Sequence, residues 1–274
     1  MTAPLPHVEG GRVRRPVPPP ARIAVEAVAL ARGGRPVLKG VSFGVVPGEV
    51  VAVVGQSGGG KSSLLRVVAG LLAPDAGRVL LSGADLARLG RRPRRAALRQ
   101  VGMLFQGGAL FDTLSAYENV AYPLRGHGRA LVGGRGPFPE AEVRDRALAA
   151  LDAVGMADHW AKRPSELSGG QQKRVALARA TVTEPTVLLC DEPTSGLDPR
   201  TAANTDALVR TLARRLGAAC LVVTHDLAAL PRLADRVVFL HDGRAHFVGS
   251  PQDLAASPDP VLQATLHPFA PDTP

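Results

Sequence analysis

The chain has 274 residues, of which 45% are hydrophobic and 21% charged, a composition typical of a globular protein rather than a disordered or fibrous one. At about 150 residues per domain, this length predicts one large domain, or one domain with a small subdomain. The two cysteines exclude a disulfide framework, and they lack the companion ligand residues of a zinc site.

The basic residues outnumber the acidic ones by 33 to 24, which leaves a formal charge of +9. Such an excess fits a nucleic acid, an anionic membrane surface or an anionic ligand, and composition alone does not choose among them. Only four of the basic residues are lysines and the arginines are scattered, so a preference for arginine over lysine can explain much of the excess. Aromatic residues make up 4%, which offers few stacking surfaces for single-stranded nucleic acid.

The sequence contains no apolar segment long enough to form a transmembrane helix. Its longest apolar run, Ala218–Val223, has six residues, whereas a spanning helix needs about 20. The first residues lack the basic region and the apolar stretch of a secretory signal. We therefore expect a cytoplasmic chain.

Residues 1–22 contain six prolines and several arginines, which predicts a disordered tail, and the fold is expected to begin near Ile23. From there, short β-branched runs are each followed by a helical pattern: 50–54 by 61–69, 186–190 by 199–216, and 219–223 by 226–233. This alternation predicts the α/β class, with a mainly parallel sheet covered by helices.

Between about 107 and 182 the strand signal disappears and helical signals replace it. Ser115 and Glu118 form a capping box, residues 140–154 are amphipathic, and Ser168 can cap a helix that runs through Ala180. We predict a helical subdomain over about 107–182, inserted into a sheet domain of residues 23–250, with a surface loop over 126–139.

The end of the predicted sheet domain has the pattern of a β-hairpin. Asp242-Gly243 is a two-residue turn signal between the apolar runs 237–240 and 245–248. Residues 251–274 are expected to form short helices and a tail.

A glycine-rich segment follows the apolar run 50–54 and opens a helix, as a phosphate-binding loop requires. Its glycines let backbone N–H groups surround phosphate oxygens, its lysine reaches the outer phosphates, and the following serine hydroxyl can ligate Mg²⁺. The residues predicted to bind nucleotide are Gly55, Ser57, Gly58, Gly59, Gly60, Lys61, Ser62 and Ser63.

Two acids, Asp191 and Glu192, end the apolar run 186–190. The first can hold Mg²⁺ and the second can polarise an attacking water, although acids that merely end a strand would look the same. Leu167–Gln171 opens a helix with a serine and two glycines, which is a second potential anion-binding helix start or a simple flexible cap.

The order of these motifs resembles that of the ATP-binding cassette family over residues 23 to about 250. The shared features are the phosphate loop, Gln106, Leu167–Gln171, Asp191-Glu192, Ser195–Asp198 and His225. The resemblance implies a P-loop NTPase fold of the RecA type, with an N-terminal antiparallel β region and an inserted helical subdomain. It also implies ATP and Mg²⁺ as cofactors, ATP hydrolysis as the activity, and no nucleic-acid partner.

The resemblance also implies roles at the matched positions. Glu192 would be the catalytic carboxylate, and His225 would contact the γ-phosphate. Gln106 would sense the nucleotide and contact either the attacking water or the Mg²⁺ that Ser62 and Asp191 ligate. The residues that would contact ATP bound by a partner subunit are Ser168, Gly170, Gln171 and Asp198. Two copies would therefore close head to tail around two ATP molecules.

A narrower resemblance comes from Met103–Asp112 and Tyr117–Leu124, which look like the ATPase subunit of Mla/Mce-type lipid transporters. It implies phospholipid or lipid transport with an integral membrane permease and an Mce-domain lipid-binding protein. The chain would then lie peripherally on the cytoplasmic face of the inner membrane. Arg32 occupies the place where most cassettes stack an aromatic ring on adenine, and a guanidinium plane can also stack.

The sequence is also compatible with other functions. One is the ATPase of another importer, for an amino acid or other small solute, and another is a soluble cassette protein acting on ribosomes or DNA. A small-molecule kinase would not account for Leu167–Gln171. Cys190 and Cys220 both fall in predicted strands and are expected to be core residues.

Overall fold

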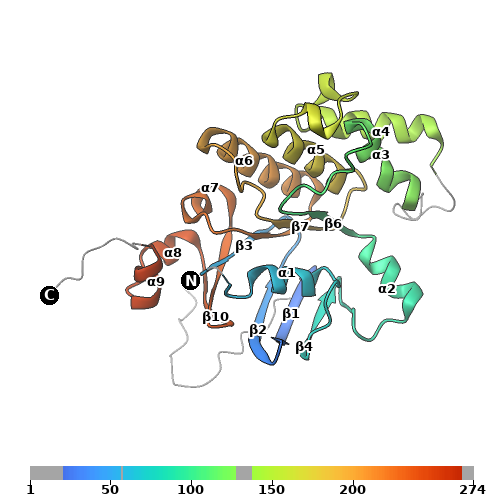
Figure 1. Cartoon of the computed structure of the whole chain (residues 1–274). Coiled ribbons are helices and arrows are strands. Elements are labelled where there is room, and N and C mark those ends of the chain that lie inside the picture. The colour runs from blue at the N-terminus through green and yellow to red at the C-terminus, as the bar shows by residue number, and fades with distance from the viewer. Residues whose placement is uncertain (1–20, 57, 128–137, 267–274) are drawn as a thin grey trace, which may run out of the picture.

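The computed structural model describes residues 21–56, 58–127 and 138–266, and Figure 1 shows the arrangement of their helices and strands. The tail expected over 1–22 and the loop expected over 126–139 fall mostly outside these ranges, as do Ser57 and the last eight residues. None of the helices in these ranges combines the length and the apolar character that crossing a membrane would take.

The strands form two sheets. The larger sheet is six-stranded, and its order is β10 (Arg244–Gly249), β9 (Arg236–His241), β3 (Val50–Gly55), β8 (Ala219–Val223), β7 (Val187–Asp191), β6 (Val101–Leu104). The smaller sheet is antiparallel and four-stranded, and its order is β2 (Arg35–Val45), β1 (Ile23–Arg32), β4 (Ala76–Leu81), β5 (Ala84–Asp85). Strands β9, β3, β8, β7 and β6 are parallel, as the alternating sequence pattern predicts.

Helices lie between the strands along the chain and also follow the last strand. They are α1 (Lys61–Val68), α2 (Arg91–Leu98), α3 (Ala116–His127), α4 (Glu140–Asp152), α5 (Gly169–Thr181), α6 (Pro199–Leu216), α7 (Leu230–Leu233), α8 (Pro251–Ala255) and α9 (Pro260–Leu266). Short 3-10 helices occur at η2 (Ala157–His159), η3 (Pro164–Glu166) and η4 (Leu227–Ala229). The single helix predicted over 226–233 is thus η4 followed by α7.

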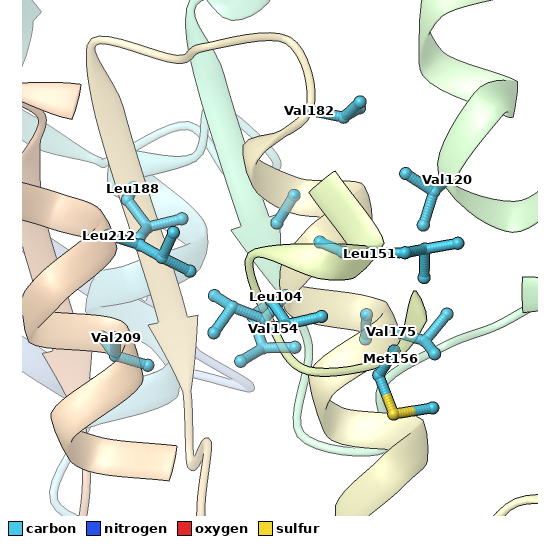
Figure 2. Close-up of a cluster of buried hydrophobic side chains, with 14 of the residues drawn as sticks. Leu104, Val120, Leu151, Val154, Met156, Val175, Val182, Leu188, Val209 and Leu212 are labelled. Carbon is cyan, nitrogen blue, oxygen red and sulfur yellow. The ribbon is translucent and has the colours of Figure 1, made fainter. Parts of the chain in front are cut away.

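The six-stranded sheet separates two cores because successive side chains of a strand point to opposite faces. On β7, Leu188 and Cys190 enter the core formed with α3 to α6, whereas Val187 and Leu189 enter the core shared with α1 and the smaller sheet. Figure 2 shows part of the first core. Both faces of β7 are buried, so its sequence is continuously apolar.

The two cysteines lie in adjacent strands of this sheet, and both are fully buried, as expected. A hydrogen bond with Cys190, together with burial, raises the pKa of the Cys220 thiol. Both residues therefore act as small core side chains.

The predicted hairpin is confirmed. Strands β9 and β10 are antiparallel, and Asp242 and Gly243 between them have φ angles of 48° and 76°. Positive φ at both turn positions is typical of the type I′ turn, which explains the Asp-Gly pair.

Candidate functional site

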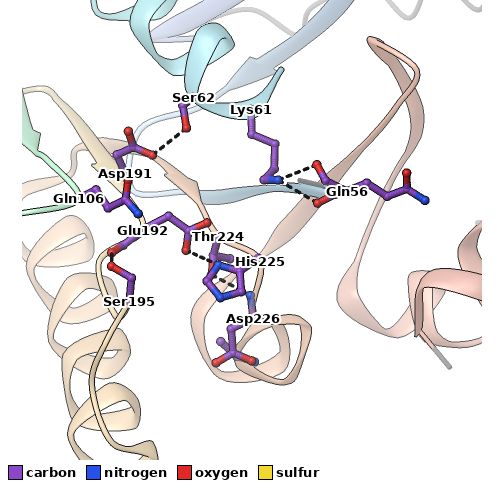
Figure 3. Close-up of polar contacts among 12 residues, drawn as sticks. Gln56, Lys61, Ser62, Gln106, Asp191, Glu192, Ser195, Thr224, His225 and Asp226 are labelled. Atoms are coloured by element: carbon purple, nitrogen blue, oxygen red, sulfur yellow. Dashed lines mark hydrogen bonds and ion pairs between the residues drawn. The ribbon is translucent and has the colours of Figure 1, made fainter. Parts of the chain in front are cut away.

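The parallel strands bring the candidate residues to one edge of the sheet. Strands β3, β7 and β8 run in the same direction, so the loops after their carboxyl ends meet, and Asp191 at the end of β7 pairs in register with Val223 of β8. The loop after β3 leads to Lys61 and Ser62 at the start of α1, and His225 lies in the loop after β8. Glu192 follows Asp191 directly. Figure 3 shows this group.

The loop between β3 and α1 has two positions that require glycine. Gly55 has a φ of 145°, and a Cβ there would collide with the carbonyl oxygen of Leu240. Gly60 precedes the helix with a φ of 94°, and a Cβ would lie 2.9 Å from Leu38 of β2. The backbone therefore makes a tight turn, and the N-terminus of α1 is left without a side-chain cap.

Lys61 lies over this loop and is largely buried. Its ammonium group donates hydrogen bonds to the carbonyl oxygens of Gly55 and Gln56, at 2.9 and 3.0 Å. Burial lowers the pKa of Lys61, and the charges of Glu192 and Asp191 oppose this shift. The lysine is thus held near the two acids without forming an ion pair with them.

Ser62 and Asp191 come together from α1 and β7. The Ser62 hydroxyl donates to Asp191 Oδ1 at 3.3 Å, and the carboxylate is buried. Burial raises the pKa of Asp191, and the hydrogen bond from Ser62 opposes the shift. A divalent cation beside this pair would offset the cost of the buried charge, and hydroxyl and carboxylate oxygens are ligands that Mg²⁺ accepts.

Glu192 is buried and has a φ of 49°, which is uncommon for a residue with a side chain. Its Oε2 atom lies 2.8 Å from Nδ1 of the exposed His225, which follows β8 (Figure 3). The imidazole therefore fixes the direction of the carboxylate. The sequence motifs place these two residues 33 positions apart, and only the sheet brings them into contact.

Gln106 follows β6 and is joined to Glu192 through a residue that the sequence analysis missed. The ammonium group of Lys173 on α5 donates to the carbonyl oxygen of Gln106 and, at 3.4 Å, to that of Glu192. Burial lowers the pKa of Lys173, against the charges of the two acids. The sequence signal that could have pointed to Lys173 is the rarity of lysine, since the chain has only four.

Ser168 and Asp198 are the N-caps of α5 and α6. Ser168 and Gln171 form a capping box, and Asp198 Oδ1 accepts hydrogen bonds from the backbone of Arg200 and Thr201. A Cβ at Gly170 would lie 2.7 Å from Thr201, so the two helix starts are in close contact. Among the described residues, no hydrogen bond or ion pair links these caps to the phosphate-loop segment.

Arg32 is exposed at the end of β1, where it pairs in register with Arg35 across the turn. Strand β2 then reaches the phosphate loop, since Val37 and Leu38 lie beside Gly60. The structure thus connects Arg32 to the loop through the β1–β2 hairpin, without a direct hydrogen bond among the described residues.

The family model for ABC transporters matches residues 38–195, which is more than half of the chain. The chain belongs to the ABC transporter family. This finding agrees with the arrangement of its phosphate loop, its paired acids and the capped start of α5. ATP-binding cassettes of this family are ATPases coupled to transport.

Curated relatives of the chain include methionine import ATP-binding proteins. The cassette is 43% identical over 228 residues to the methionine import ATP-binding protein MetN of Caulobacter vibrioides, covering 83% of this chain and 66% of that protein. It is 40% identical over 247 residues to the methionine import ATP-binding protein MetN 1 of Rhodopseudomonas palustris, covering 90% and 61%. The cassette thus spans less than two thirds of the length of these relatives.

Solved structures confirm the predicted fold class, a P-loop NTPase with a mainly parallel sheet, an N-terminal antiparallel sheet and helices. The dimeric structure of MJ0796, a bacterial ABC transporter cassette, has a TM-score of 0.73 and 32% identity, covering 84% of this chain and 98% of that chain. The cbiO1 protein from Clostridium perfringens, part of the ABC transporter complex cbiONQ, has a TM-score of 0.76 and 31% identity, covering 90% and 95%.

The Mla/Mce lipid-transport assignment, including its Mce-domain partner, is not supported by these relatives. Much of the segment that suggested it serves the fold. Leu110 and Tyr117 pack against the helical core, and the Asn119 side chain hydrogen-bonds the backbone of Phe111 and Leu114. Residues that stabilise the cassette itself carry little information about its cargo.

Proposed function

We propose that the cassette is the ATP-hydrolysing subunit of an ABC importer, and that it drives an integral membrane permease from the cytoplasmic face of the inner membrane. The observation that carries the proposal is the meeting of Lys61, Ser62, Asp191, Glu192 and His225 at one edge of the sheet. This group combines a phosphate-binding cation, two oxygen ligands for a metal and a positioned carboxylate.

The residues of the loop would hold ATP, with Lys61 exchanging its carbonyl partners for the outer phosphates. Ser62 and Asp191 would hold Mg²⁺, which neutralises phosphate charge when bound. Gln106 is proposed as a further ligand, since Lys173 links its backbone to that of Glu192, the neighbour of Asp191. Glu192 would orient the attacking water and accept its proton, with His225 fixing the carboxylate. Arg32 is proposed to stack on the adenine.

The caps of α5 and α6 are proposed to complete the site of a second copy. Ser168, Gly170, Gln171 and Asp198 lie at the two adjacent N-termini of α5 and α6, where Ser168 and Asp198 are exposed, and such N-termini favour negative charge such as a phosphate. The dimeric cassette structure with 32% identity supports a homodimer. The two copies are proposed to close around two ATP molecules.

The first candidate cargo is an amino acid, because the curated relatives are named as methionine importers. Lipid transport of the Mla/Mce type is the second candidate, and it rests only on the part of Met103–Asp112 that does not serve the fold, such as the exposed Phe111. The test is to reconstitute the cassette with its permease in vesicles, and to measure ATP-dependent movement of labelled methionine and of labelled phospholipid. Movement of neither, with ATP hydrolysis intact, would leave the ATPase proposal standing and reject both cargoes.

The permease is proposed to dock at an apolar groove between β6, α3 and α5. Phe111 and Tyr122 line this cavity of about 330 Å³, with their ring centroids 4.9 Å apart and with 43% and 54% of each residue exposed. In the segment after Gln106, Leu110 and Tyr117 are partly buried against the core, whereas Phe111 is exposed and can serve as an anchor.

We expect Phe111→Ser to weaken permease association by about thirtyfold, the loss of about 2 kcal/mol that a buried aromatic anchor typically contributes. Cargo transport should fall with it, while nucleotide binding by the isolated cassette persists. Leu71→Ser is the matched control, because Leu71 is 58% exposed and lies outside the groove. Pull-down with the detergent-solubilised permease measures association, and equal retention of both variants would reject docking at this groove.

A further inference from the structure

A long stretch around α2 is basic without any acidic residue. Between Asp85 and Asp112 the sequence contains six arginines and no aspartate or glutamate. Helix α2 begins at Arg91 and has no acid in its first turn, although a helix N-terminus favours negative charge. Figure 1 shows α2 at the outer edge of the molecule.

Four of these arginines line one cavity of about 560 Å³, which we call the arginine pocket. Helical spacing explains their convergence, since positions three and four apart share a face. Leu89 and Leu98 add an apolar wall, and Gly70 completes the lining. The four arginines are Arg91, Arg94, Arg95 and Arg99.

The positive charge of the arginine pocket is not compensated within the described residues. None of its four arginines forms an ion pair there with an acid. Arg94 donates to the carbonyl oxygen of Gly70 at 2.7 Å, but the Nε atoms of Arg94 and Arg99 are buried without a hydrogen-bond partner. Buried donors are ordinarily paired, and both arginines line this basic cavity, so the two unpaired Nε–H groups and the uncompensated charge together favour an anionic ligand.

We propose that the arginine pocket binds a phosphate ester. Guanidinium groups pair with phosphate oxygens through two parallel hydrogen bonds, which makes arginine the preferred residue for this anion. The cavity lies within the size range of small-molecule sites, about 300–1,000 Å³, and is therefore larger than a bare phosphate needs. Its leucine wall fits an uncharged group attached to the phosphate.

The source of the phosphate ester is either an anionic lipid headgroup or a soluble molecule. Leu98 and Arg99 also line the apolar groove beside Phe111, so the pocket and the groove are adjacent. A permease helix docked in that groove would bring the pocket near the membrane surface. The pocket shares no residue with the phosphate loop, so its test is independent of ATP hydrolysis.

The first experiment follows the arginine Nε–H signals of the full chain by NMR, with Mg-ADP present to fill the phosphate loop. Inorganic phosphate is the probe. We expect saturable shifts of the Arg94 and Arg99 signals, and Arg95→Gln should weaken this binding by about tenfold, as the loss of a charge-assisted hydrogen bond predicts. Arg92→Gln is the matched control, because Arg92 belongs to the same helix but does not line the cavity.

The second experiment identifies the source by flotation with vesicles of phosphatidylglycerol and of phosphatidylcholine. If the chain binds the phosphatidylglycerol vesicles, and Arg95→Gln weakens this binding more than Arg92→Gln does, the result supports the pocket with a lipid headgroup as its ligand. Phosphate binding without vesicle binding supports the pocket with a soluble phosphate ester.

Two results would overturn the proposal. One is that neither inorganic phosphate nor the phosphatidylglycerol vesicles bind saturably, although circular dichroism shows that the chain is folded. The other is an equal loss in Arg92→Gln and Arg95→Gln, since binding would then follow the net charge of α2 and not the cavity.

Discussion

Replacing Lys61 by alanine is expected to reduce ATP hydrolysis by about a thousandfold, the scale seen when a preorganised charge is removed from a reacting group. The Lys61 ammonium group is buried above the loop, close to Asp191 and Glu192, and alanine would leave the loop without this cation for the β- and γ-phosphates. Nucleotide binding should weaken as well. Phosphate release and fluorescence titration with a labelled nucleotide measure the two effects.

The control for this change is Lys162→Ala, which removes an exposed lysine whose recorded contacts are made by its backbone. We expect the control to hydrolyse ATP at the parent rate. Hydrolysis by Lys61→Ala within about threefold of the parent, far from the expected loss, would contradict the assignment of the phosphate loop.

The change Glu192→Gln is expected to stop hydrolysis and to keep ATP bound. Glutamine has the size of glutamate and can keep the contact with His225, but its amide cannot accept the proton of an attacking water. We expect a loss of about 10²–10⁴-fold in turnover, the usual contribution of a general base. Because bound ATP is no longer consumed, the closed homodimer should accumulate in Mg-ATP, and analytical ultracentrifugation measures it.

Glu184→Gln is the matched control, since Glu184 is an exposed glutamate with nearly the same φ angle, 50°. It pairs with Arg146 and has no recorded contact with the site residues. The dimer model is wrong if Glu192→Gln stays monomeric in saturating Mg-ATP and also when reconstituted with the permease.

The predictions that succeeded from sequence rest on local physics. Gly55 and Gly60 have positive φ angles of 145° and 94°, which the local backbone of the loop requires, and the Asp242-Gly243 turn needs two positive φ angles in adjacent residues. The predicted capping box of Ser115 and Glu118, which the structure confirms, also lies within one helical turn. These features depend on residues that are close in the sequence, so the sequence alone could predict the fold class and locate the motifs.

Other features depended on contacts between distant segments, and only the tertiary structure decided them. The hydrogen bond between Glu192 and His225 exists because β7 and β8 are neighbours, and Lys173 joins two loops that no sequence spacing relates. Sequence likewise could not tell that Phe111 is exposed while Tyr117 packs on the core, because both are aromatic residues of one segment. Burial is set by what packs against a side chain, and that partner comes from elsewhere in the chain.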